Sequence, residues 1–230
     1  MKSSIPVALP DNTQSGWTSE WRNKYGTQLN NAKTVVIEGE ITQIGRFNFD
    51  NGRPGAYDNL EKVVLSPNVT KISTAAFSDI DALKSINLNN VQIIENAAFA
   101  DSGVESVTFE NEELEIGEYA FQDCTALTTV TAKKIQDLGS NAFNGCTSLK
   151  TFNCETPLDK IPNECFQKTA LTSFDFKDVS SVGVNAFNES SLKYACYSGT
   201  KAKWDEMVPA PSWMGATVPA DTIVHCKGDA

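Results

Sequence analysis

Residues 116–127 read Ile-Gly-Glu-Tyr-Ala-Phe-Gln-Asp-Cys-Thr-Ala-Leu, and close variants of this segment recur along most of the chain. Each variant places an aliphatic residue five positions before a phenylalanine. Successive phenylalanines are separated by 28, 22, 22, 22, 23 and 21 residues, and they are Phe49, Phe77, Phe99, Phe121, Phe143, Phe166 and Phe187. A repeat of nearly constant length is typical of a solenoid, in which each repeat forms one coil and contacts only its neighbours.

A second pattern, Leu-x-x-Val-x-Leu, follows the phenylalanine segment in each repeat, as in Leu127, Val130 and Ala132. The alternation of its last two apolar residues predicts one strand per repeat with a single buried face. The Ala-Phe segment is expected to form a short helical or 3₁₀ turn on the opposite side of the coil. Neither part could bury its apolar face alone, so the pattern predicts a stacked leucine-rich-repeat solenoid.

The combined repeat L-x-x-I-x-L followed by I-x-x-x-A-F-x-x-C-x-x-L resembles the BspA-like class of leucine-rich repeats, found in bacterial surface proteins and in some protozoan and phage-encoded ones. The resemblance covers about residues 34–192, and the Ala-Phe dipeptide with its downstream cysteine is the distinguishing mark. Residues 197–207 and 223–226 are similar to the closing module of such arrays. The resemblance implies a non-enzymatic, adhesive binding module without a cofactor, located outside the cell or on its surface.

We therefore predict an α/β fold: a right-handed leucine-rich-repeat solenoid of about seven coils, forming one domain over residues 1–230. A parallel β-helix is the alternative, because its coils can have a similar length. Residues 1–32 are expected to form a leader and an N-terminal cap helix, residues 33–191 the repeats with an insertion at 50–59, and residues 192–230 a C-terminal cap.

Both caps have sequence signals of their own. Trp17, Trp21, Tyr25 and Leu29 recur every four residues, which predicts one face of an N-terminal helix. The C-terminal cap is expected to contain a strand over 192–197, a helix over 200–207 and a last strand over 222–226. Terminal repeats must differ from the others because they cover the end of the core, so Trp204 is interpreted as part of a lid.

The net charge of −10 and the isoelectric point near 4.6 oppose binding to phosphate backbones and to anionic lipid surfaces. No segment approaches the roughly 18 apolar residues that a membrane helix needs, and the first residues lack a signal-peptide core. We therefore expect no nucleic-acid partner and no membrane insertion, and we take a monomer as the default.

The six cysteines fall into two groups. Cys124, Cys146, Cys154 and Cys165 occupy repeat positions where small buried residues are expected. Cys196 and Cys226 lie outside the regular repeats and form the one pair for which a disulfide is considered, although free thiols are favoured. No cysteine or histidine spacing predicts a metal site.

Catalytic motifs are not found in the sequence. The single histidine, His225, lies in the expected last strand, and no nucleophile or nucleotide-binding motif occurs. Acidic residues are numerous enough to keep a glycoside hydrolase with a carboxylate pair as a less favoured alternative. The densest acidic segment, residues 110–115, is interpreted as a solvated loop rather than a calcium site.

The outward-facing side of the predicted strands carries short polar side chains in two columns. The candidate ligand-binding face consists of Ser85, Asn87, Ser106, Thr108, Thr129, Thr131, Thr151, Asn153, Ser173 and Asp175. Such a face offers repeated donors and acceptors to a protein or glycan on the concave side of the solenoid. Two alternatives stay open: the threonines and serines serve only the strand propensity of a solvated sheet, and the domain is a spacer of a larger surface or phage protein.

Overall fold

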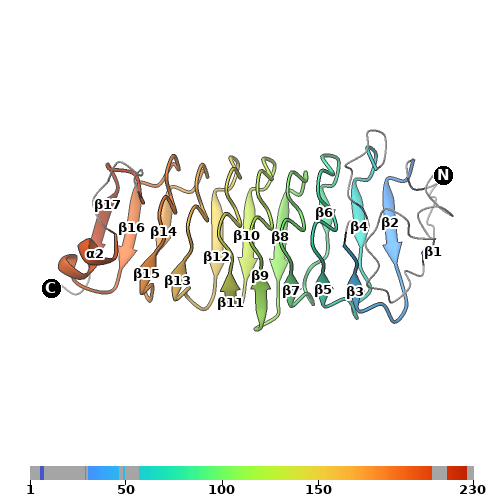
Figure 1. Cartoon of the computed structure of the whole chain (residues 1–230), viewed down its shortest axis with the longest axis horizontal. Coiled ribbons are helices and arrows are strands. Elements are labelled where there is room, and N and C mark those ends of the chain that lie inside the picture. The colour runs from blue at the N-terminus through green and yellow to red at the C-terminus, as the bar shows by residue number, and fades with distance from the viewer. Residues whose placement is uncertain are drawn as a thin grey trace.

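The computed structural model describes residues 6–7, 29, 31–46, 49, 57–208 and 217–226. These residues wind into a parallel-strand solenoid of about six turns. In Figure 1 the coils between β2 and β17 follow one another in a nearly straight row. The predicted N-terminal helix and residues 50–56 of the insertion lie outside the described residues, apart from Leu29, which is helical and buried. The predictions of seven coils, a right-handed winding and the three-part division of the chain stay predictions.

Each coil contributes one strand to a surface that we call the first face. Its strands are β1 (Pro6–Val7), β2 (Thr34–Ile37), β4 (Lys62–Val64), β6 (Ser85–Ile86), β8 (Ser106–Phe109), β10 (Thr129–Ala132), β12 (Thr151–Cys154), β14 (Ser173–Asp175), β16 (Tyr194–Tyr197) and β17 (Ile223–Cys226). They pair in parallel within three groups, β1-β2-β4-β6, β8-β10-β12 and β14-β16-β17. The Leu-x-x-Val-x-Leu pattern predicts β4, β6, β8, β10, β12 and β14, and the expected C-terminal cap contains β16 and β17. β1 was not predicted, because residues 1–32 were expected to form a leader and a cap helix.

A second set of strands forms another surface, the second face. Its members are β3 (Gln43–Ile44), β5 (Lys71–Ile72), β7 (Ile93–Ile94), β9 (Leu114–Ile116), β11 (Ile135–Leu138), β13 (Lys160–Ile161) and β15 (Ser181–Val182). They pair in parallel as β3-β5-β7-β9-β11 and β13-β15. The expectation of one strand per repeat is therefore wrong, because the backbone before each Ala-Phe segment also pairs with the next coil and satisfies its polar groups there. Two parallel strands per coil are a feature shared with the β-helix alternative.

The Ala-Phe segments form turns, and the prediction of helical or 3₁₀ structure there is wrong. The residue two positions before the phenylalanine has a left-handed φ of 51–60° in each coil, at Ala75, Ala97, Tyr119, Asn141, Glu164 and Asn185. The phenylalanine N–H donates to the next coil, for example from Phe99 to the carbonyl of Ala120 at 2.8 Å. A backbone N–H used between coils is not available for an intrahelical bond, so a ladder of turns replaces the helix. Helix in the described residues is confined to α2 (Lys201–Met207) and Leu29, so the solenoid is confirmed with almost no helix and the α/β class stays a prediction.

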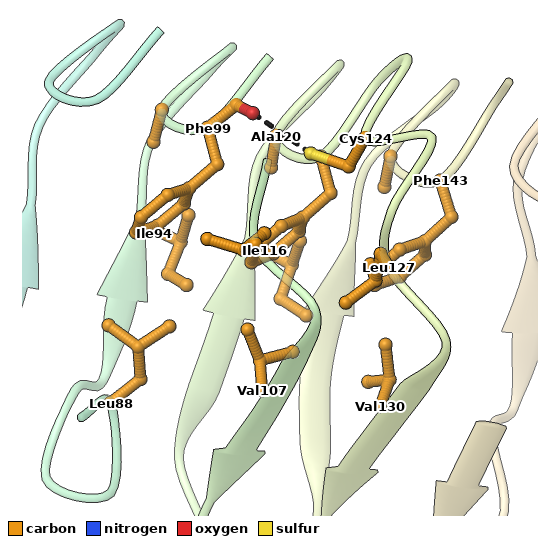
Figure 2. Close-up of a cluster of buried hydrophobic side chains, with 14 of the residues drawn as sticks. Leu88, Ile94, Phe99, Val107, Ile116, Ala120, Cys124, Leu127, Val130 and Phe143 are labelled. Atoms are coloured by element: carbon orange, nitrogen blue, oxygen red, sulfur yellow. Dashed lines mark hydrogen bonds between the residues drawn. The ribbon is translucent and has the colours of Figure 1, made fainter. Parts of the chain in front are cut away.

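The phenylalanines of the repeats stack into a continuous spine inside the coils. Ring centroids of successive members from Phe49 to Phe187 lie 5.0–5.7 Å apart, and the rings are within 21° of parallel. The seven rings are fully buried. Figure 2 shows part of this core, with Val107 and Val130 from the first face and Ile94 and Ile116 from the second directed toward the spine. The predicted packing register of the repeats is confirmed.

The cysteines of the repeats are mostly small buried fillers. Cys124 Sγ lies 3.0 Å from the carbonyl oxygen of Phe99 (Figure 2), and Cys146 makes the same contact with Phe121. Burial raises the pKa of the Cys124 thiol to about 12, so it stays protonated at neutral pH. Cys165 is also buried. Cys154 is only partly buried, which corrects the expectation of a core position.

The C-terminal segment contains the predicted strand, helix and strand as β16, α2 and β17. Thr200 caps α2 by accepting a hydrogen bond from the Lys203 N–H, and Trp204 on α2 is buried against Phe176 and Tyr197, with ring centroids 5.0 and 5.7 Å away. None of the six cysteines forms a disulfide, so the alternative of a disulfide between Cys196 and Cys226 is wrong. Cys196 pairs in register with His225, so Cys196 and Cys226 point to opposite sides of adjacent strands.

Glu95 joins its coil to the preceding one. Its carboxylate accepts hydrogen bonds from the Thr74 N–H at 2.8 Å and the Thr74 hydroxyl at 2.9 Å, and it forms an ion pair with Lys71 Nζ at 2.5 Å. Burial raises the pKa of Glu95, but the hydrogen bonds from Lys71 and Thr74 outweigh it, so the pKa lies below its ordinary 4.5. A carboxyl whose pKa is lowered on folding stabilises the fold above its ordinary pKa and loses this contribution as the pH falls through the lowered value.

We expect Glu95→Gln to lower the free energy of unfolding by about 1 kcal/mol at neutral pH. Because the variant has no carboxylate to protonate, its stability should fall less than that of the wild type as the pH drops below 4.5. Urea unfolding at a series of pH values measures both effects. Glu113→Gln, an exposed loop residue, serves as the control. Parallel pH profiles for the wild type and Glu95→Gln would contradict the prediction.

Candidate functional site

The polar residues predicted on the strands lie together on the outside of the first face. Strand register places Ser106, Thr129 and Thr151 in one column and Thr108, Thr131 and Asn153 in the next. Ser85 and Ser173 occupy the first position in their own repeats, and Asn87 and Asp175 the second, although β6 is not hydrogen-bonded to β8 nor β14 to β12. All ten candidate residues are exposed or half-buried. In Figure 1 this face belongs to a straight row of coils rather than to a horseshoe.

Some side chains of these columns already form hydrogen bonds within the protein, and others do not. Asn87 is tied to the preceding coil, because its Oδ1 accepts from the Leu65 N–H at 2.6 Å and its Nδ2 donates to the Leu65 carbonyl at 3.1 Å. Asp175 Oδ1 accepts from the Lys177 N–H at 3.0 Å. The hydroxyls of Ser106, Thr108 and their column neighbours make no hydrogen bond within the described part of the chain. These hydroxyls therefore remain able to bind a partner.

The two columns continue past the predicted residues into the C-terminal segment. Tyr194 stands next to Ser173 and Ile223 next to Tyr194, while Cys196 and His225 extend the column of Asp175. Tyr194 and Ile223 are both 51% exposed, which is unusual for large apolar side chains. Sequence reasoning missed them because it treated residues 192–230 as a cap. The signal was present, since Leu192, Ala195 and Tyr197 follow the Leu-x-x-Val-x-Leu spacing.

A groove of about 500 Å³ opens on the first face where the sheet is interrupted. Its walls and floor come from β12, β14, β16 and β17, and the lining includes Phe152, Phe174, Tyr194, Cys196 and His225. The predicted face residues Thr151, Asn153, Ser173 and Asp175 also line it. We call this feature the first-face groove.

The groove lies at one of two breaks in the first face, because β12 and β14, like β6 and β8, are not hydrogen-bonded to each other. The inward-facing position of the first-face strands is occupied by Val63, Ile86, Val107 and Val130 in earlier coils, but by Phe152 and Phe174 here. Those two rings lie side by side with centroids 6.0 Å apart. At the break between β6 and β8, Ile86 and Val107 occupy this position, so the two rings distinguish the break at the groove but are not required for a break in the sheet.

The second face is interrupted one coil earlier, between β11 and β13, where a cavity of about 650 Å³ lies. At this position of other coils Gly117, Gly139 and Gly183 each donate a backbone N–H to the preceding coil at 2.7 Å. Pro162 takes their place in the coil of β13 and has no N–H to donate. The missing donor accounts for the break, and the coil of β12 and β13 pairs with different neighbours on its two faces.

Charged residues border the first face just before each strand, and their backbones are bonded in sequence from coil to coil. Lys33, Glu61, Lys84 and Glu105 alternate in sign in the first half. Lys33 Nζ lies 2.8 Å from Glu61 Oε1, and the pKa of Glu61 is lowered by Lys33 first and by Lys84 second. The same border carries Thr128, Lys150, Thr172 and Lys193 in the second half. Within the described residues neither Lys150 nor Lys193 has an ion pair.

Metal and membrane sites find no support in the described ranges. Histidine, cysteine, aspartate and glutamate do not gather in groups of three or more that could hold a metal ion there. Asp101, on the turn side, has a raised pKa because of its burial and then the negative charges of Asp123, Asp79 and Asp81. None of the described helices is long and apolar enough to cross a membrane.

The repeats match the model of a known protein family. A model described as the BspA type leucine rich repeat region, in six copies, matches residues 42–134 and 92–207. The chain belongs to the BspA-type leucine-rich repeat family. The match spans the strands from β3 to β16 and α2, and it confirms the family resemblance seen in the repeats. No curated protein matches the chain.

One solved bacterial structure shows the same fold, and two others are less similar. A leucine-rich repeat protein from Bacteroides ovatus has 21% identity and a TM-score of 0.57 over 84% of this chain and 62% of its own. A leucine rich cell surface protein from Faecalibacterium prausnitzii has 16% identity, a TM-score of 0.44 and coverages of 80% and 64%. The pneumococcal vaccine antigen PcpA has 19% identity, a TM-score of 0.45 and coverages of 73% and 41%. The chain thus spans less than two thirds of each of these proteins.

Proposed function

We propose that this BspA-type repeat module is a non-enzymatic recognition domain that binds a protein or glycan through its first face. The observation that carries the proposal is the first-face groove, where Tyr194 is exposed and Phe152 is partly exposed beside the columns of hydroxyl and amide side chains. Binding sites combine apolar floors with a few polar groups that fix orientation, and aromatic residues supply most of the binding energy. The hydroxyl columns alone lack such anchors.

The spacer function is the second candidate, and the first half of the first face favours it. There the columns carry no exposed aromatic residue, and the charged border is neutralised by its own alternating signs. A location outside the cell or on its surface is part of the proposal, and it rests on the resemblance of the repeats to those of bacterial surface proteins. The proposed module needs no cofactor, and neither nucleic acid nor membrane insertion is part of its function.

We expect Thr108→Arg combined with Thr131→Arg to reduce ligand binding at least about tenfold, because two long charged side chains would cover the middle of the first face. Glycan and host-protein arrays probed with the full chain identify the ligand, and titration of the hits measures the loss. The control is Thr125→Arg with Thr147→Arg, which changes two exposed threonines on the turn side.

Three outcomes separate the candidates. Binding that depends on Thr108 and Thr131 but not on Thr125 and Thr147 supports the proposal. Arrays without any ligand favour the spacer. Turnover of an oligosaccharide would overturn both functions, because it requires catalytic residues that neither includes.

A further inference from the structure

We propose that the first-face groove binds an acidic peptide segment of a partner protein, with one apolar side chain of that peptide placed over Phe152 and Phe174. The inference rests on the proposed function and names the ligand class of the same site. It joins two observations, an accessible apolar groove and two unpaired lysines at its border.

The apolar part of the site consists of two rings at the inward-facing strand position, of which Phe174 is 8% exposed, and two exposed side chains in the outward column beside them. Phe152 is only partly buried, and it faces Phe174 across the interruption between β12 and β14. Tyr194, in the next strand, lines the same groove, and Ile223 adjoins Tyr194 in register. A ligand that covers these four side chains must offer apolar surface to the aliphatic side chain of Ile223 as well as to the three aromatic rings. A leucine or phenylalanine side chain does so, whereas a sugar stacks on rings but has little to gain from Ile223.

The charges at the site favour an anionic partner. Lys150 lines the groove and Lys193 occupies the same border position two coils later. In the first half Lys33 forms an ion pair with Glu61, and Lys84 stands between Glu61 and Glu105 along the border. In the second half Thr172 stands between Lys150 and Lys193. Asp175 is the acid that lines the groove, and its carboxylate already accepts the Lys177 N–H. The chain has a net charge of −10, which repels acidic partners over most of its surface. The two unpaired lysines supply positive charge beside the apolar groove, so an acidic segment can bind there.

The interrupted sheet adds main-chain groups that suit a peptide. In the preceding pair the N–H groups of Lys150 and Thr151 both donate to the Thr128 carbonyl, at 3.0 and 3.2 Å. No backbone hydrogen bond joins residues 172–176 to residues 150–154 in the same way. The backbone N–H and C=O groups on the facing edges of β12 and β14 therefore do not hydrogen-bond to each other. Peptide main chains recognise strand edges through such groups.

The test is selection of peptides from a random display library on the full chain, with counter-selection on Ser173→Arg. Ser173 is exposed in the groove, and an arginine there fills it from the outward side. Ser85→Arg, in the same column of the first half, is the matched control. We expect the peptides that bind the wild type and Ser85→Arg but not Ser173→Arg to contain aspartate or glutamate around an apolar residue.

Fluorescence polarisation with the selected consensus peptide separates the two contributions. Replacing its apolar residue by serine should raise the Kd about tenfold or more. Lys150→Ser with Lys193→Ser should raise it about threefold to tenfold at low salt, and less at high salt. Lys84→Ser with Lys133→Ser removes the same charge elsewhere and should leave the Kd unchanged. Melting curves confirm that each variant is folded.

Several results would overturn the inference. These are a selection without any peptide that discriminates Ser173→Arg, a consensus that is neutral or basic, or a glycan from the arrays whose binding is abolished by Ser173→Arg. If a ligand is lost with Thr108→Arg and Thr131→Arg but not with Ser173→Arg, the inference falls and the proposed function stands. If nothing binds the first face at all, the proposed function itself falls.

Discussion

Phe121→Ala is expected to lower the free energy of unfolding by about 3–5 kcal/mol, the cost of leaving a large cavity in a packed core. Phe121 is fully buried in the middle of the spine. Its ring stacks on Phe99 at 5.1 Å and on Phe143 at 5.4 Å, and it meets Phe109 edge-on at 6.4 Å. The backbone on both sides is held by bonds to neighbouring coils, so the cavity cannot collapse easily.

Urea unfolding of the full chain measures this loss. Tyr119→Ala is the matched control, since Tyr119 is an aromatic residue of the same turn that is 41% exposed, and its loss should cost less than about 1 kcal/mol. Phe121→Leu should fall between the two because it keeps most of the buried volume. A loss below about 1 kcal/mol for Phe121→Ala would contradict the stacked spine, since a buried ring of this size cannot be removed so cheaply.

Much of the fold could be predicted because one residue type at constant spacing defines the repeat. The phenylalanines fixed the register, and the Leu-x-x-Val-x-Leu pattern located the first-face strands. The second-face strands were missed because several contain only two residues, too few for an alternation to be visible. The turn conformation was missed because Ala75, Ala97 and Tyr119 carry no local preference for a left-handed φ. Hydrogen bonds to the next coil impose it, and these depend on tertiary structure.

The candidate site also has a part that could be predicted from the sequence and a part that could not. The columns from Ser85 to Asp175 follow from register alone and were predictable. The groove depends on the width of two adjacent rings, Phe152 and Phe174, and on the alignment of β16 and β17 with the repeats. A hydrophobic pattern treats Phe and Val as equivalent. Such a pattern therefore could not show that two large rings would line a break in the sheet.

The coil that contains β12 and β13 shows how much irregularity the solenoid tolerates. Its first strand pairs with β10 and its second with β15, so the two faces are interrupted at different junctions. The turn ladder continues across both, as in the bond from the Phe143 N–H to the Cys165 carbonyl at 2.9 Å. The spine also continues, with its widest spacing of 5.7 Å between Phe143 and Phe166. Openings on the faces are therefore compatible with an unbroken core.

Gly139→Ala is expected to cost about 3 kcal/mol, although it adds a single methyl group. A Cβ atom at this position would lie 2.4 Å from the Glu118 nitrogen and 2.4 Å from the Gly117 carbonyl carbon. Both atoms belong to the backbone of the preceding coil, so they cannot move aside as a flexible side chain would. The Gly139 N–H also donates to the Ile116 carbonyl at 2.7 Å, and any separation of the coils that makes room for the methyl group lengthens this bond.

Thermal and urea unfolding measure the effect of Gly139→Ala, and Ser73→Ala provides the matched control. Ser73 occupies the same place in an earlier coil, where its N–H donates to the Ile44 carbonyl at 2.9 Å and a Cβ atom is already accommodated. Ser73→Ala adds no atom, so it should change the stability by less than about 1 kcal/mol. A loss of stability for Gly139→Ala that is as small as the loss for Ser73→Ala would mean that the coils can separate at Gly139 without cost. That result would contradict the close contact, because the second face would then not need a glycine to keep β9 and β11 paired.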